Sequence, residues 1–401
     1  MSKYLNKITS ISLLVTVLNA CIEPFEAQIV DFESAVVVEA TLTNQTEQHE
    51  VLITRTFKFE EEGSEAESGA SVRVVGGNTT YTFSEVSPGR YIADQAFAAI
   101  SGVNYQLIIT TKDGRNYSSN EVTLTQETQI DDLRAERITL DDGREGVAIL
   151  VDSFDPTRNS INYRYEYEET YKIIAPFWRP LDLRVPENAS ESDCDLEVVQ
   201  REQPEQVCFT TNESNTIIIT NTGDLEEDRV DNFLVRFIDR DNFIISHRYS
   251  ILVRQFVQSN EAFSFYKTLR EFSGNQSLFS ETQPGFLEGN ISSTQDENEL
   301  VMGYFEVSST SEQRIFFNYE DLFPNEPLPP YIIDCSPFSP PLVDGIPPQC
   351  ILRPQVEMNF VRYFDDNPSP GLTEGPFLVV LRTCGDCTTL GSTTPPTFWT
   401  E

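Results

Sequence analysis

The chain has 401 residues, 39% of them hydrophobic, and carries 64 acidic against 28 basic side chains, a net charge of -36. This length is enough for two or three domains, and the hydrophobic content supports packed cores rather than disorder. Nucleic acids are polyanions that favour clustered Lys and Arg, so we expect no nucleic-acid partner for so acidic a chain. The acidic side chains are expected to form a solvated surface.

The N-terminal residues predict export and a lipid anchor. Two lysines precede an apolar run at residues 8–18, which is too short to cross a bilayer core. Residues 1–20 therefore read as a secretory signal peptide. The Leu-Asn-Ala-Cys text at 18–21 resembles a bacterial lipobox, in which the thiol of Cys21 takes a diacylglycerol. The alternative is an ordinary signal peptide with a chance cysteine. Residues 21–32 are expected to form a short tether.

Residues 33–127 predict an Ig-like or prealbumin-like β-sandwich. Short runs rich in Val, Ile, Thr, Tyr and Phe are separated by turn signals such as Gly76-Gly77-Asn78. The text Pro88-Gly89-Arg90-Tyr91 resembles the carboxypeptidase-regulatory-like domains found on Bacteroidota envelope proteins. The predicted strands are 34–43, 50–59, 70–77, 79–86, 90–97, 104–111 and 121–126.

Residues 128–401 predict a larger β-rich domain with one helix. The helix is expected near 260–273, because apolar residues recur there at three- and four-residue spacing and Gly274 follows them. Tyr163, Tyr165 and Tyr167 share one face of a predicted strand, where they form either core or a ligand platform. The predicted strands are 146–154, 162–173, 215–221, 232–239, 245–257, 301–307, 314–319 and 377–383.

The six remaining cysteines predict disulfide bonds. They are Cys194, Cys208, Cys335, Cys350, Cys384 and Cys387. An even number of cysteines in an exported protein indicates disulfides. Because Cys194 and Cys208 stand apart from the others in mid-chain, we expect them to pair with each other, and the other pairings stay open. The two alternatives for Cys384-Gly385-Asp386-Cys387 are a redox pair, and a zinc site shared with Cys335 and Cys350.

A long insertion at residues 172–212 carries the best candidate for partner binding. It contains Phe177, Trp178 and Arg179, and aromatic and arginine side chains dominate interface hot spots. Burial of these side chains in a core is the alternative.

No catalytic residue can be selected from the sequence. The two histidines, His49 and His247, lie in no recognisable catalytic motif. A choice of two carboxylates for glycoside hydrolysis among 64 acids would be arbitrary. We therefore expect a protein that is not an enzyme, with no metal and no cofactor.

Several motifs together resemble one known family. They are the lipobox followed by Ile22-Glu23-Pro24-Phe25, the single late helix, the GNISS text at 289–293, the VMGYFEVSS text at 301–309, and the closing CGDC at 384–387. This combination resembles the Bacteroidota outer-membrane lipoproteins grouped as domain of unknown function 4249 (DUF4249). The resemblance implies a lipid-anchored exported protein, often encoded beside TonB-dependent receptors, and it assigns no catalytic residue.

The leading functional expectation is an accessory or ligand-capture subunit of an outer-membrane β-barrel, namely a TonB-dependent transporter. The protein is expected in the outer membrane, held by lipid on Cys21 and facing the cell exterior, with the periplasmic face as the alternative. Rival functions are a surface hydrolase that uses paired carboxylates, and an envelope adhesin or assembly factor. The ligand, a small molecule or a peptide, is not identified by the sequence.

Overall fold

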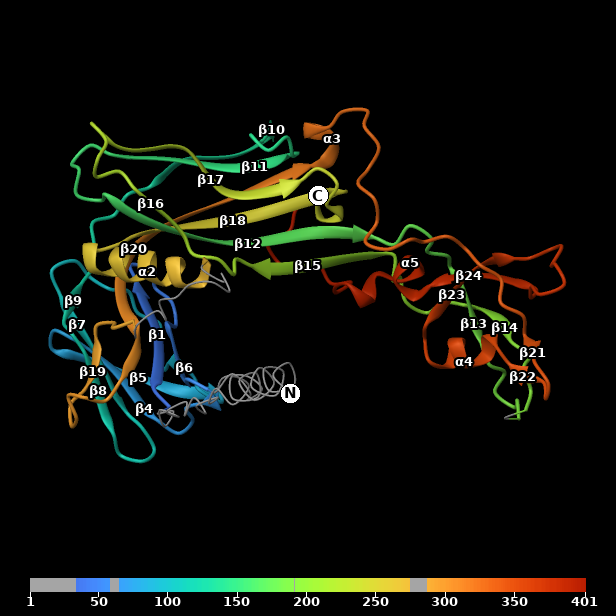
Figure 1. Cartoon of the computed structure of the whole chain (residues 1–401), viewed down its shortest axis with the longest axis horizontal. Coiled ribbons are helices and arrows are strands. Elements are labelled where there is room, and N and C mark those ends of the chain that lie inside the picture. Colours follow the sequence, from blue (N-terminus) through green and yellow to red (C-terminus); the bar gives the residue numbers. More distant parts are fainter. Residues whose placement is uncertain (1–33, 58–64, 191, 275–286) are drawn as a thin grey trace, which may run out of the picture.

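The computed structural model describes residues 34–57, 65–190, 192–274 and 287–401. The predicted signal peptide (1–20), Cys21 and the tether (21–32) lie outside the described residues. Among these residues no helix is both long and apolar enough to cross a membrane. The fold is mainly β, as predicted, and its longest sheet joins 15 strands (Figure 1).

The first unit is a sheet that curves around one core. Its strands show the expected alternation of burial, with Val72 and Val74 on one strand and Leu107 and Ile109 on its neighbour all turned inward. The strands are β1 (Val36–Thr43), β2 (Glu50–Arg55), β3 (Glu65–Ala66), β4 (Ser71–Gly76), β5 (Thr79–Ser87), β6 (Arg90–Ala93), β7 (Asn104–Thr110), β8 (Asn116–Ser119) and β9 (Val122–Thr123).

Two strands from far along the chain complete this unit. β19 (Ile291–Ser293) pairs with β8, and the first half of β20 (Val301–Asn318) runs parallel to β1 (Figure 1). Ile291 and Phe305 belong to the same core as Val38. The predicted boundary at residue 127 is therefore wrong, because the sandwich also needs residues 291–308. A parallel partner strand so distant in sequence leaves no local signal.

Close backbone contacts explain the Gly and Asn of the GNISS and VMGYFEVSS motifs. Gly303 has φ +104°, and a Cβ there would lie 1.8 Å from the carbonyl oxygen of Val38. A Cβ on Gly289 would lie 1.5 Å from the carbonyl oxygen of Gly303. The side chain of Asn290 donates to the carbonyl of Phe305 and accepts from its amide, both at 2.8 Å. These contacts hold residues 289–290 against β20.

The second unit is a sandwich of two sheets. A sheet of order β10-β11-β17 packs on a sheet of order β15-β12-β18-β20. Tyr163 and Tyr165 are fully buried between these sheets, so they are core residues rather than a ligand platform. The elements are β10 (Ile130–Thr139), β11 (Glu145–Asp155), β12 (Asn162–Ile174), β15 (Val207–Glu213), β16 (Ile218–Asn221), β17 (Asp228–Asp239), η1 (Phe243–Ile245) and β18 (Arg248–Val257).

The two units share strand β20. Its first half, to Ser308, pairs with β1, and its second half, from Ser309, pairs with β18. The predicted strands 301–307 and 314–319 are therefore parts of one strand of 18 residues.

The predicted helix is confirmed as α2 (Asn260–Gly274). Ser259 is its N-cap, because the side-chain oxygen of Ser259 accepts a hydrogen bond from the amide of Ala262 at 3.1 Å. The prediction of one helix was incomplete, because three short helices lack enough turns to create a periodic pattern. These are α3 (Tyr319–Leu322), α4 (Leu352–Glu357) and α5 (Arg382–Gly385), with the 3-10 turn η2 (Cys387–Thr389) after them.

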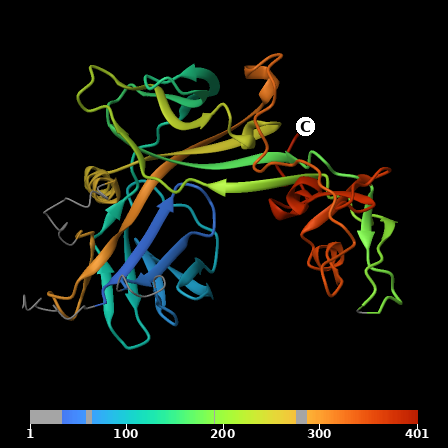
Figure 2. The same ribbon diagram turned by 45° about the vertical axis from the view of Figure 1, so that its right-hand side comes forward.

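A small distal lobe, residues 177–206 and 331–387, extends from the second unit away from the first (Figures 1 and 2). It has its own core around Leu183, Leu352 and Val379. The predicted long insertion is thus half of a packed lobe rather than a loop. The lobe strands are β13 (Leu181–Arg184), β14 (Glu197–Gln200), β21 (Val343–Asp344), β22 (Gln349–Cys350), β23 (Val361–Asp366) and β24 (Phe377–Leu381).

Candidate functional site

All six cysteines that were predicted to be disulfide-bonded form disulfides. The bonds are Cys194–Cys350, Cys208–Cys387 and Cys335–Cys384. The expected pair Cys194–Cys208 is wrong, because Cys194 lies in the distal lobe while Cys208 lies in the core of the second unit. The two cysteines of the CGDC motif bond to different distant partners. They are therefore neither a redox pair nor zinc ligands in this structure.

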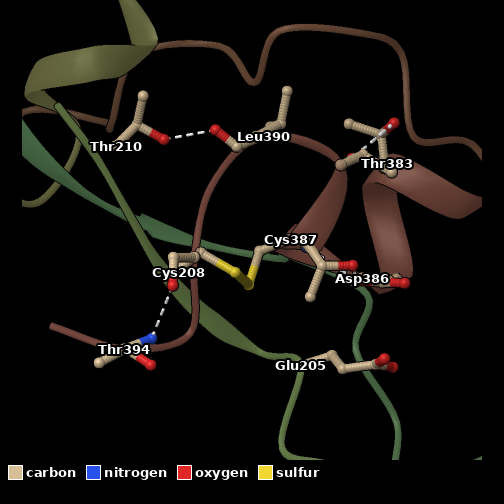
Figure 3. Close-up of a disulfide and its surroundings, with 12 residues drawn as sticks. Glu205, Cys208, Thr210, Thr383, Asp386, Cys387, Leu390 and Thr394 are labelled. Carbon is tan, nitrogen blue, oxygen red and sulfur yellow. Dashed lines mark hydrogen bonds between the residues drawn. A yellow bond between two sulfur atoms is a disulfide. The ribbon is translucent and has the colours of Figure 1, made fainter. Parts of the chain in front are cut away.

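The Cys208–Cys387 disulfide fastens the base of the distal lobe to β15 (Figure 3). Both sulfur-bearing side chains are fully buried. The amide of Cys387 donates to the carbonyl of Glu205 at 3.0 Å, and Thr210 donates to the carbonyl of Leu390. The covalent bond and these hydrogen bonds together fix where the lobe leaves the second unit.

Asp386, inside the CGDC motif, is a fully buried ion-pair partner. Its carboxylate accepts from Arg362 Nη2 at 2.6 Å, from Arg382 Nε at 3.0 Å and from the amide of Thr388 at 2.8 Å. Burial alone would raise the pKa of Asp386, but these hydrogen bonds outweigh burial and lower the pKa below its ordinary value. The charged form of Asp386 therefore stabilises the lobe.

Replacing Asp386 by Asn should give a stability loss that depends on pH. Because the folded-state pKa is lowered, the stabilisation by the Asp386 carboxylate is present above the unfolded-state pKa of about 3.9 and is lost as pH falls through the folded-state pKa. The difference between wild type and Asp386→Asn in urea midpoint should therefore shrink from pH 7 to pH 3. The exposed Asp131→Asn is the control, and a pH-independent difference for Asp386→Asn would contradict this assignment.

Phe177, Trp178 and Arg179 lie where the chain passes from β12 into the distal lobe. The ring of Phe177 packs edge-on against Phe364 at 5.2 Å between centroids, and the guanidinium of Arg179 lies 4.4 Å from the same ring. Trp178 packs against the core of the second unit. Packing within the chain accounts for the two aromatic residues. Their role as partner contacts stays a prediction.

A groove of about 730 Å³ lies between the first and second units. We call it the interunit groove. Its first wall is formed by β1, β2 and the turn between them, and its second wall by β12, β18, β20, α2 and the end of β15 with the residues that follow it. The lining residues with exposed or half-buried charged and apolar side chains include Glu39, Glu47, Glu166, Glu213, Leu52 and Leu269. The sequence signal for this groove is the pattern in β12, where Arg164, Glu166 and Glu168 alternate with the three tyrosines.

Arg164 fixes the floor of the interunit groove. It is 5% exposed, and its Nη2 donates to Glu306 Oε2 at 3.0 Å. Its guanidinium lies between the rings of Phe256, at 4.2 Å, and Tyr266, at 4.7 Å. Glu306, on the shared strand β20, also accepts from Gln258 at 3.0 Å. This buried cluster holds α2, β12 and β20 together beneath the groove.

The interunit groove is strongly acidic. Its lining contains seven glutamates and two arginines among the described residues. His49 adds no charge at neutral pH, because burial lowers the pKa of its imidazole. Its Nε2 lies 2.8 Å from the carbonyl oxygen of Phe97. The groove therefore favours a positively charged ligand.

Comparison with known proteins gives a family and no function. No curated protein matches the chain. Among solved structures, the chain is similar to a "Biofilm associated protein - BSP domain" at 7% identity and a TM-score of 0.11, covering 71% of this chain and 59% of that one. It is also similar to a "Biofilm associated protein - B domain" at 8% identity and a TM-score of 0.10, covering 72% and 89%. The chain thus spans about three fifths of the BSP-domain structure, and these TM-scores support no functional argument.

The family model described as "Domain of unknown function (DUF4249)" matches residues 22–314. This span contains both β units up to residue 314, near the end of β20, together with the GNISS and VMGYFEVSS texts. Residues 315–401, with the CGDC motif, lie outside the match. Since the match covers well over half of the sequence, the chain belongs to the DUF4249 family.

Proposed function

We propose that this protein is a non-enzymatic, lipid-anchored binding protein of the outer membrane, which captures a ligand for a TonB-dependent β-barrel transporter. The observation that carries the proposal is the interunit groove of about 730 Å³. Ligand sites are typically concave and largely pre-formed, with a few polar groups that orient the ligand. The shared strand β20 and the buried Arg164–Glu306 pair hold the two walls of the groove in place.

Two features support an exported, anchored protein. The N-terminal sequence combines a short apolar run with a lipobox-like cysteine, Cys21. The six cysteines from Cys194 to Cys387 are all paired, as is usual in oxidising compartments outside the cytosol. A diacylglycerol on Cys21 would place the first unit, which begins at β1, nearest the membrane surface. The proposal places the protein on the outer leaflet, facing the cell exterior.

The test is a crosslinked pull-down of the native protein from its own membranes, solubilised in detergent and identified by mass spectrometry. We expect stoichiometric recovery of one β-barrel receptor. A Cys21→Ala variant is the control, since loss of the anchor should abolish membrane association and the recovery together. Recovery of the lipidated protein without any barrel would contradict the transporter role.

A further inference from the structure

One face of the second unit already binds a polypeptide segment, which is the chain's own C-terminus. We call this face, formed by β12, β18 and β20 and turned away from the core, the outer sheet face. Residues alternate along β20, so that Ile315 and Phe317 pack into the core while Arg314 and Phe316 point outward. Residues 396–401, which form neither helix nor strand, lie against the outward side chains.

The C-terminal segment is held by aromatic and charged contacts. The ring of Phe398 lies 3.6 Å from the guanidinium carbon of Arg314. Trp399 packs edge-on against Phe316, at 5.8 Å between ring centroids. Glu401 pairs with Lys172 at 2.8 Å. Arg248 also donates to the carbonyl of Thr400, so basic side chains surround an acidic and aromatic segment. This seat shows how the outer sheet face recognises a polypeptide.

The interunit groove continues the same face toward the first unit. Glu168, which lines the groove, pairs at 2.6 Å with Arg314, which holds Phe398. Next along β18 and β20, Arg254 and Glu312 pair across the strands at 3.0 Å. Leu52 and Leu269, both half-buried, supply apolar surface in the groove lining. The groove thus repeats the mixture of apolar and charged side chains found under the C-terminal segment.

The charge of the groove is opposite to that of the C-terminal seat. Within the described residues, Glu39 and Glu213 have no ion-pair partner, and Glu47 approaches only His49, at 3.6 Å. Arg164 forms ion pairs with both Glu166 and the buried Glu306. The negative charge of the groove is therefore only partly neutralised within the described part of the chain, whereas the C-terminal seat is basic.

One buried donor on the groove floor also lacks an acceptor. The Nε atom of Arg164 has no hydrogen-bond partner among the described residues, although the side chain is only 6% exposed. An unsatisfied buried donor costs free energy, and a carbonyl oxygen would satisfy it. A polypeptide main chain supplies such oxygens, whereas a simple amine does not.

We propose that the interunit groove binds a polypeptide segment that carries lysine or arginine beside an aromatic side chain. The cationic groups would pair with Glu39, Glu47 and Glu213, and the aromatic ring would pack on Leu52 and Leu269. This mode copies the seat of the C-terminal segment with the charges reversed. The inference rests on the proposed capture role of the groove and names its ligand class.

The test uses two fluorescein-labelled peptides and the full-length protein in detergent. One peptide is Pro-Pro-Lys-Phe-Trp-Lys-Lys, and the other has glutamate at each lysine position. We expect the lysine peptide to bind at least about tenfold more tightly in an anisotropy titration, with an affinity that falls as salt rises. Equal binding of the two peptides would overturn the proposal.

A charge-reversed pair of variants locates the site. Glu39→Lys combined with Glu213→Lys should weaken binding of the lysine peptide about tenfold or more. The matched control, Asp131→Lys with Asp231→Lys, makes the same change in net charge on β10 and β17, outside the groove lining. An equal loss of binding in both variants would overturn the groove as the site.

The peptide titration and the pull-down can fail separately. Tight binding of the lysine peptide without recovery of a barrel would support the groove inference and contradict the transporter role. Recovery of a barrel without preference for the lysine peptide would support the transporter role and contradict the groove inference.

Discussion

Replacing Cys208 and Cys387 together by alanine should lower the free energy of unfolding by about 4 kcal/mol. The two residues are 179 positions apart, but the Cys194–Cys350 and Cys335–Cys384 bonds shorten the ring that the Cys208–Cys387 bond closes to roughly 35 residues. Closing a ring of about that size removes unfolded-state entropy worth about 4 kcal/mol. Urea unfolding should therefore show a lower midpoint. The slope of the unfolding free energy against urea concentration should be measured as well, because a changed slope would show that the variant also alters the unfolded state.

The Cys194→Ala, Cys350→Ala double variant separates this global effect from a local one. That disulfide lies within the distal lobe, so its loss should leave the lobe attached to β15. Limited proteolysis should cut near residues 201–206 in the Cys208, Cys387 variant and not in the Cys194, Cys350 variant. An unchanged urea midpoint for the Cys208, Cys387 variant would refute the stabilising role of this bond.

Glu306→Leu should cost about 3–5 kcal/mol, because it leaves the buried guanidinium of Arg164 without its main counter-charge. The loss should spread to both units, since Glu306 lies on the shared strand β20. Thermal and urea unfolding with probes in each unit would measure it.

Glu312→Leu is the matched control on the same strand. Glu312 also pairs with an arginine, Arg254, but both side chains are about half exposed. Exposed ion pairs contribute about 0–1 kcal/mol, so the two variants should differ by several-fold in their stability loss. Equal losses would show that burial of the Arg164–Glu306 pair is not what makes it important.

Local sequence patterns predicted much of the secondary structure. The alternating runs around Val72 and Leu107 became strands, and the three- and four-residue spacing before Gly274 became α2. The strand from Ile130 to Thr139 was missed, since its many charged residues hide the alternation. The short helices α3 to α5 were missed because they have too few turns.

Long-range pairing was beyond local patterns. The parallel pairing of Val36 with Val301 carries no signal in either segment, so local patterns alone predict a first unit that ends at residue 127. Spacing likewise favoured Cys194–Cys208, although disulfide partners are set by the tertiary fold. The groove was also missed, because Glu39 and Glu213 come to line one groove only when the two units share β20.

The late arrival of β20 has a consequence for synthesis. β9 ends at Thr123, and the half of β20 that pairs with β1 ends at Ser308, so β1 has no β20 partner during the synthesis of the intervening 185 residues. At about 5–20 residues per second, this interval lasts roughly 10–40 s. An open strand edge is a template for pairing with other chains. A first unit that folds during this interval exposes the open edge of β1 until β20 arrives, and a product interrupted before residue 301 keeps this edge open.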